Sequence, residues 1–230
     1  MTHPESETRL ALRRIGAVCA FAGPLLLLAS TLMHPMGQDP NDSVAAFAEY
    51  AADRRWVWTH LGQFGGFALT GAALVGLSAQ LEMGWAAAWG RIGMFAAGVS
   101  VAVAAALQAV DGIALKAVVD RLAAAEGALR PAIFEAAFAV RQIEIGLAGL
   151  LSVSFGLALL VFAAGLGASV RFPRWFAVVA GVAGIGTFAA GCAQSASGFS
   201  AVSMTLSMAS SVIALGWGWA LGALLLRKPT

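Results

Sequence analysis

Residues 142–166 decide the fold, and they read QIEIGLAGLLSVSFGLALLVFAAGL. After Glu144 the chain carries no ionisable side chain until Arg171. An apolar run of this length matches the roughly 20 residues that an α-helix needs to cross the hydrocarbon core of a bilayer. The run also lacks the period-2 alternation of a barrel strand, so it predicts a transmembrane helix.

The composition extends this prediction to the whole chain. Of the 230 residues, 60% are hydrophobic and 11% are charged, whereas soluble domains carry about 25% charged and about 45–50% apolar residues. A soluble globule could not bury so much apolar surface, and in lipid only helices and closed barrels satisfy their backbone hydrogen bonds. We therefore predict an all-α polytopic transmembrane bundle with no separate soluble domain.

Six apolar runs are long enough to span the membrane. They cover residues 15–33, 56–81, 91–112, 142–166, 175–193 and 202–226. The first run follows three arginines, as the apolar core of a signal peptide does. However, no small-x-small cleavage site stands out before His34-Pro35, so we interpret this run as a retained span.

Six spans place both termini on one side of the membrane, and the basic residues indicate which side. Those assigned to the cytoplasm flank span ends in short loops, where the positive-inside rule applies best. They are Arg9, Arg13, Arg14, Arg91, Arg171, Arg174, Arg227 and Lys228. We predict cytoplasmic ends at 1–14 and 227–230, with one transmembrane domain at 15–226 in the bacterial cytoplasmic (inner) membrane.

The segments between the spans predict further helices on the outer side. In the loop 34–55, Asp42 and Ser43 offer N-cap chemistry, and apolar residues then recur at helical spacing. This pattern predicts a short amphipathic helix on the outer membrane surface. The third and fourth spans continue with charged residues interleaved, so we expect 113–141 to form an extracytoplasmic helical hairpin with its tip near 127–130.

Eight polar side chains fall in the outer third of the predicted bundle. They are His34, His60, Gln63, Gln108, Asp111, Lys116, Arg141 and Glu144. Ionisable groups at this depth are costly unless they are paired or solvated, which makes them functional candidates. The hairpin geometry allows the cross-helix pairs Asp111–Arg141 and Lys116–Glu144, and Arg141 and Glu144 are also i, i+3 neighbours.

We expect these residues to form the polar mouth of a pocket that binds a lipid or another amphipathic small molecule. Phe64, Phe67 and Phe95 would line an apolar cavity below it. A purely structural interpretation stays open, in which the charges hold the hairpin together and the histidines bond to loop backbone.

Two other functions also stay open. An intramembrane enzyme could use Asp111 or His60 as an acid or base on an isoprenoid or lipid, and an accessory or scaffold subunit of a membrane complex would need no chemistry. His34 and His60 are candidate metal or haem ligands. They lack HxxxH or HExxH spacing, so we predict no cofactor.

The net charge bears on nucleic-acid binding, and the spacing of small residues bears on dimerisation. A net charge of +2 without a basic run does not indicate a nucleic-acid partner. The pairs Gly62–Gly66 and Gly218–Gly222 have the small-xxx-small spacing that allows a homodimer. Cys19 and Cys192 should lie at opposite membrane faces, too far apart for a disulfide.

Four short motifs resemble a known group of proteins. They are His34-Pro35, Trp56-x-x-x-His60, Asp111-Gly112-x-Ala-Leu-Lys116 and Arg141-x-x-Glu144. The chain is similar in these motifs to uncharacterised small multi-pass membrane proteins of high-GC, actinobacterial-type bacteria, over roughly its first two thirds. The resemblance implies a fold and a location in the membrane, but no activity.

Overall fold

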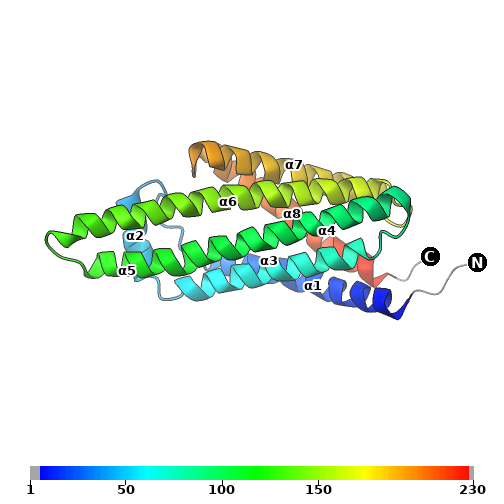
Figure 1. The fold of residues 1–230 in the computed structure, drawn as a ribbon, viewed down its shortest axis with the longest axis horizontal. Helices are drawn as coiled ribbons and strands as arrows, with labels where there is room; N and C mark the ends of the chain where they lie inside the picture. The colour runs from blue at the N-terminus through cyan, green and yellow to red at the C-terminus, as the bar shows by residue number, and fades with distance from the viewer. Residues whose placement is uncertain (1–5, 228–230) are drawn as a thin grey trace, which may run out of the picture.

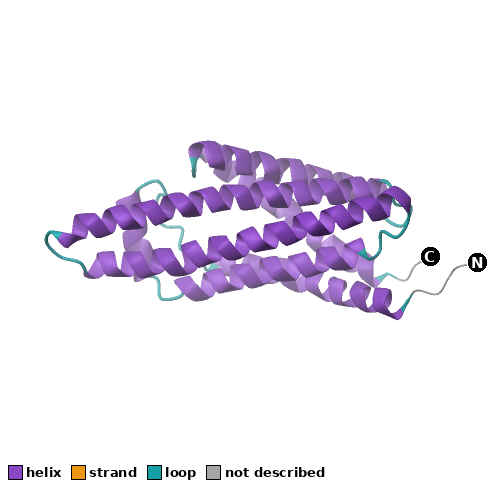
Figure 2. Cartoon of the chain, viewed as in Figure 1, coloured by secondary structure: helices purple, strands orange, loops and turns teal. Residues whose placement is uncertain are grey.

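The computed structural model describes residues 6–227, and within that range every regular element is a helix (Figure 1 and Figure 2). In chain order these are α1 (Glu7–Leu32), α2 (Ser43–Ala52), α3 (Trp56–Ser78), α4 (Gly84–Gln108), the π-helix η1 (Ala109–Leu115), α5 (Lys116–Ala124), α6 (Leu129–Gly167), α7 (Arg174–Ser197) and α8 (Ala201–Leu226). Because η1 and α5 follow α4 without a break, the three form one long rod.

Six helical segments of the described range are long and apolar enough to cross a membrane. They are α1, α3, the α4–η1–α5 rod, α6, α7 and α8. The predicted six-span all-α bundle is therefore confirmed. α1 begins and α8 ends at one end of the elongated bundle, and the tip between α5 and α6 lies at the other (Figure 1). Which end faces the cytoplasm stays a prediction.

The six spans form a closed ring that follows the chain. α1 packs on α3, α3 on α4, α4 on α6, α6 on α7, and α7 on α8, which returns to α1. Large side chains fill the centre of the ring, where Phe162 is fully buried and the Trp217 ring stacks on Phe176 at a centroid distance of 4.8 Å. Trp217 Nε1 donates to the Phe176 carbonyl at 3.1 Å, so its polar atom is satisfied in the apolar core.

Glycines bring the backbones of α6 and α7 into contact. Gly149 and Gly156 on α6 face Gly191 and Gly184 on α7. A Cβ added at Gly184 would lie 3.0 Å from the Gly156 carbonyl oxygen, and one at Gly191 would lie 2.7 Å from that of Gly149. Lipid tails are as apolar as leucine, so close packing of this kind is a main source of helix association in membranes.

Both glycine pairs predicted as dimer contacts lie against α1 of the same chain. The contacts are Gly62 with Ser30, Gly66 with Leu27, Gly218 with Pro24, and Gly222 with Phe21. These faces therefore hold the ring together, and only an opened ring could offer them to a second copy. Homodimerisation itself stays a prediction. The two cysteines are both free thiols, as expected.

Two spans begin earlier than predicted. α1 starts at Glu7 with Ser6 as its N-cap, so residues 7–14 of the predicted N-terminal segment are its first turns. α4 starts at Gly84 instead of Arg91. Gly84 has a φ of +54°, which ends the preceding turn and lets the helix begin there. Residues 1–5 and 228–230, with the predicted cytoplasmic Lys228, lie outside the described residues.

α5 and the first part of α6 form a helical hairpin, as predicted, and its extracytoplasmic position stays a prediction. α6 has 39 residues, which makes it roughly 58 Å long at about 1.5 Å per residue, against a hydrocarbon core of about 30 Å. Gly127, with a φ of +58°, makes the turn at the tip. Arg130 Nη1 donates to the carbonyls of Leu122 and Ala125 at 2.9 and 3.3 Å, which satisfies the end of α5.

α2 begins as predicted, and its position at a membrane surface stays a prediction. The Asp42 side chain caps it by accepting from two backbone N–H groups. Its apolar face, which includes Phe47 and Tyr50, is buried against α5 and α6. The Phe47 ring lies 5.6 Å from that of Phe134 on α6. The hairpin therefore covers the apolar face of α2 that we had expected to face lipid.

Two alanine substitutions on α7 test the α6–α7 contact. Gly184→Ala should lower the free energy of unfolding by about 1–3 kcal/mol, the usual cost of overpacking, because the new methyl meets the α6 backbone. Gly181→Ala is the matched control, since its Cβ would have only Ala163 nearby, at 3.8 Å. Thermal unfolding in detergent measures both, and equal stability of the two variants would contradict the contact.

Candidate functional site

The eight predicted site residues lie at the hairpin end of the ring, and the structure divides them into groups. His34, His60 and Asp111 form the first group, and Arg141 and Glu144 form the second. Lys116 stands apart, at the end of α2. The two glutamines join neither group by a described hydrogen bond: Gln63 is half-buried on α3, and Gln108 is buried with its Oε1 unpartnered among the described residues.

Asp111 lies in the π-helix, which the sequence did not predict. A π turn shifts the register of the side chains that follow and often marks a functional site. The Asp111 carbonyl accepts a hydrogen bond from Trp56 Nε1 at 3.0 Å, and its carboxylate faces His60. Gly112 makes this approach possible, because a Cβ at that position would lie 2.5 Å from the Cβ of His60.

His60 is almost fully buried, and both of its ring nitrogens have a partner. Nδ1 lies 2.7 Å from the Trp56 carbonyl, and Nε2 lies 3.0 Å from Asp111 Oδ2. A carbonyl only accepts, so Nδ1 carries a hydrogen and Nε2 of the neutral ring is an acceptor that faces a second acceptor. In the protein without an ion, a proton must lie between Nε2 and Oδ2.

His34 joins this pair from the loop after α1. Its ring centroid lies 5.1 Å from that of His60 and 4.9 Å from that of Trp56. Its Nδ1 lies 2.8 Å from the Pro35 carbonyl, so this histidine also donates from Nδ1. Burial lowers the pKa of His34 below its ordinary value of 6.5, and the nearby His60 lowers it further. The ring is therefore neutral at neutral pH, with an unprotonated Nε2.

Arg141 and Glu144 are buried together on α6. Arg141 Nη1 donates to Glu144 Oε2 at 2.5 Å, and Nη2 donates to the Pro40 carbonyl at 3.4 Å. The guanidinium carbon lies 4.7 Å from the Phe199 ring centroid and 5.4 Å from that of Tyr50, both within cation–π range. The pair thus ties α6 to the loops before α2 and after α7.

The cross-helix pairs that we predicted do not form. Asp111 contacts His60 instead of Arg141, and Lys116 pairs with Asp120 instead of Glu144. Lys116 Nζ also donates to the carbonyls of Tyr50 and Ala51, so the cation caps the C-terminus of α2. The prediction was wrong because it treated 113–141 as two straight helices, whereas η1 rotates the residues that follow it. The expected i, i+3 pair on α6 is confirmed.

Four residues of this region were not among the predicted site residues, although two of them stand in the motifs: Tyr50, Trp56, Gly112 and Phe199. Trp56 is fully buried and bonded to the Asp111 backbone. Its i, i+4 spacing to His60 was the signal available in the sequence. Nothing in the sequence could place Phe199, because it comes from a loop distant in the chain.

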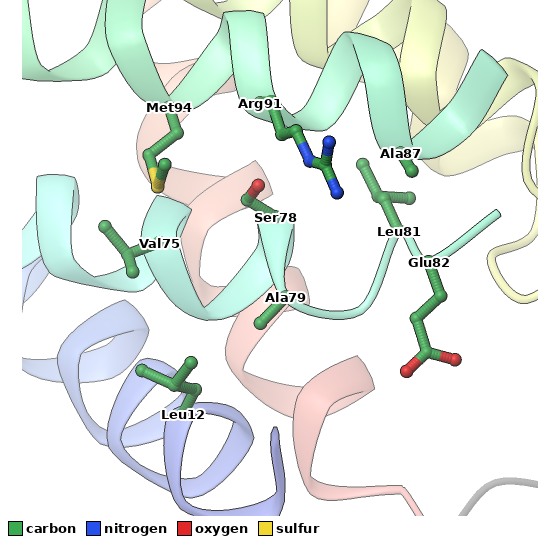
Figure 3. Close-up of a pocket in the computed structure, with 9 residues that line it drawn as sticks. All are labelled: Leu12, Val75, Ser78, Ala79, Leu81, Glu82, Ala87, Arg91 and Met94. Carbon is green, nitrogen blue, oxygen red and sulfur yellow. The ribbon is translucent and has the colours of Figure 1, made fainter. Parts of the chain in front are cut away.

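The expected apolar cavity below the polar residues is not among the pockets that the structure describes. Phe95 is 74% exposed on the outside of the ring, and Phe67 packs against Phe155 at 5.5 Å. One described pocket, of about 410 Å³, lies at the opposite end of the bundle between α1, α3 and α4 (Figure 3). The other lies beside the hairpin. Neither is lined by His60 or Asp111, the acid or base that an enzyme would use.

Comparisons with protein families, with curated proteins and with solved structures found no match to this chain. The function must therefore be argued from the geometry.

Tyr50 offers a direct test of the site, because it is the only tyrosine in the chain. Burial raises its pKa from 10 to about 12, and Glu144, Asp111 and Glu49 add to the shift while Arg141 opposes it. Tyrosinate absorbance should therefore rise near pH 12. Between the two pKa values the folded state holds the proton and the unfolded state does not, so stability falls as pH rises through this range. A transition near pH 10 in the folded protein would contradict the burial.

Gly112→Ala should disturb His60, because the added methyl collides with the His60 Cβ. We expect a loss of about 1–3 kcal/mol in the free energy of unfolding. Gly146→Ala on α6 is the control, since its Cβ would meet nothing within 4 Å. Thermal unfolding of both variants measures the difference, and a Gly112 variant as stable as the control would refute the close approach of η1 to α3.

Proposed function

We propose that this integral membrane protein binds a lipid, or a similar chain-shaped amphipathic molecule, beside the hairpin. The observation that carries the proposal is a groove of about 380 Å³ between α2 and the hairpin. Its lining is almost entirely apolar and consists of Val44, Phe47, Ala48, Ala51, Ala52, Val119, Leu122, Ala123, Arg130 and Phe134. Ligand sites of this volume and character are typical of small apolar molecules.

The level of the groove favours a lipid. Phe134 precedes Glu144 by ten residues on α6, which places it roughly 15 Å further from the apolar part of that helix. An apolar groove at the headgroup level or above can shield an acyl chain that leaves the bilayer. Val44 in its lining is 69% exposed, which leaves apolar surface accessible at the groove.

Arg130 supplies the polar end of the groove. Its Nη1 serves the two carbonyls at the end of α5, and the residue as a whole is exposed. A guanidinium has five N–H donors, so further donors can contact an anionic headgroup. The buried Arg141 is a poorer headgroup site, because Glu144, Pro40 and two aromatic rings already surround it.

The ligand class is the one predicted from the sequence, a lipid or amphipathic small molecule. Its proposed position is the groove instead of the buried polar residues. The proposal also includes the predicted orientation, with the hairpin outside the cytoplasmic membrane of a bacterium. The positive-inside rule and the motif resemblance support that orientation and source.

Native mass spectrometry of the purified full-length chain tests lipid binding. Ala48→Trp fills part of the groove and should reduce retention of lipid about tenfold. If the indole pushes two methylene groups of the lipid out of the groove, their lost burial costs roughly 1.6 kcal/mol of binding free energy. Ala136→Trp is the matched control, since this exposed alanine lies on α6 outside the groove lining. Arg130→Gln should reduce any preference for anionic over zwitterionic lipid. Equal retention by the two tryptophan variants, or no retained lipid in the unchanged protein, would overturn the proposal.

A further inference from the structure

Three potential metal ligands meet where α3, η1 and the loop after α1 come together. His34, His60 and Asp111 each offer one ligand atom, and these atoms all lie within 4.8 Å of one another. In a tetrahedral zinc site with ligand bonds of about 2.0–2.1 Å, ligand atoms are roughly 3.3 Å apart. The distance from His60 Nε2 to Asp111 Oδ2 is already 3.0 Å, so side-chain rotation alone could complete the arrangement.

Both histidines are held as metal ligands usually are. A ligating histidine almost always donates its other ring N–H to a carboxylate, a backbone carbonyl or water, which fixes the tautomer and the ring orientation. His34 Nδ1 donates to the Pro35 carbonyl, and His60 Nδ1 donates to the Trp56 carbonyl. In the neutral form of each ring, Nε2 is thereby left as the nitrogen that can bind a metal ion.

The Asp111 carboxylate has an oxygen without a hydrogen-bond partner, which a cation would satisfy. Asp111 Oδ1 is buried and has no hydrogen-bond partner among the described residues. Its other oxygen shares a proton with Nε2 of His60. A buried polar atom without a partner costs free energy. A positive ion between the three side chains would satisfy Oδ1 and take the place of that proton.

We propose that His34, His60 and Asp111 bind a first-row divalent transition metal ion such as zinc. Two imidazoles with one carboxylate suit zinc or ferrous iron better than calcium or magnesium, which prefer oxygen ligands. Three protein ligands leave at least one coordination position open, as in catalytic metal sites. From the sequence we named His34 and His60 as candidate metal ligands but predicted no metal, because the three ligands are 26 and 51 residues apart in the chain and form no recognised spacing.

The surroundings support binding from the solvent side. The Asp111 side chain is 13% exposed and that of His60 is 2% exposed, so an ion would reach the carboxylate first. The neighbouring Arg141 and Glu144 neutralise each other and leave the Asp111 charge for the ion. This site and the lipid groove share no lining residue, so each can exist without the other.

Zinc binding to the full-length protein, stripped with a chelator, tests the proposal. Calorimetric titration with Zn²⁺ and elemental analysis after desalting should give one zinc per chain. His34→Ala and Asp111→Asn should each weaken binding by at least about 100-fold, since loss of a ligand exceeds the 10–100-fold cost of losing an outer partner. Substitution with Co²⁺ should give visible d–d absorption that both variants lose.

Control variants and a folding check keep the test decisive. Asp120→Asn removes an exposed carboxylate nearby, and Cys192→Ala removes an exposed thiol. Both should bind zinc as the unchanged protein does. Circular dichroism checks that each variant is folded, and His34 is the safest ligand to remove because it lies in a loop outside the spans. Failure of the folded, unchanged protein to bind Zn²⁺ would show that only a proton joins His60 to Asp111. Zinc binding by the folded His34 and Asp111 variants that is as strong as that of the unchanged protein would show the same. Lipid retention should be unchanged in the His34 variant, so this result is independent of the groove.

Discussion

Ionisable side chains that are withdrawn from water need partners, and this constraint organises the hairpin end of the molecule. Arg141 and Glu144 are buried on α6 and satisfy each other, while the loops and rings around them supply the remaining contacts. His60 and Asp111 do the same between α3 and η1. Each pair joins elements that are distant in the chain, so the polar groups also determine how the loops and α2 close over the ring.

Close packing of small and aromatic residues, instead of polar contacts, holds the rest of the ring together. Along α6 and α7 the helices meet through glycines, because lipid gives no hydrophobic drive and only close packing is available. In the centre, Phe162 and the stacked pair Phe176–Trp217 fill the space. The apolar ring thus forms a well-packed base, and the buried polar groups lie where its helices continue past the apolar part.

The π-helix connects these two regions. We predicted the pair Asp111–Arg141 on the assumption that 109–115 is a regular α-helix. With η1 in place, the Asp111 carbonyl meets Trp56 and its carboxylate meets His60. The resulting cluster of two histidines and one carboxylate has the donors and the tautomers of a metal site, and it lies beside a groove with the shape and polarity for a lipid.

The sequence by itself determined the class of fold, the six spans, the hairpin and the capped helix before it, because run length, charge placement and N-cap chemistry are local properties. It also identified all three members of the proposed metal site as polar residues of one end of the bundle. Only the tertiary structure decided how they pair and that they meet, since this depends on a π turn, on the close approach of Gly112 to His60, and on a loop that returns His34 to α3. These are contacts between residues distant in the chain, and no spacing in the sequence encodes them.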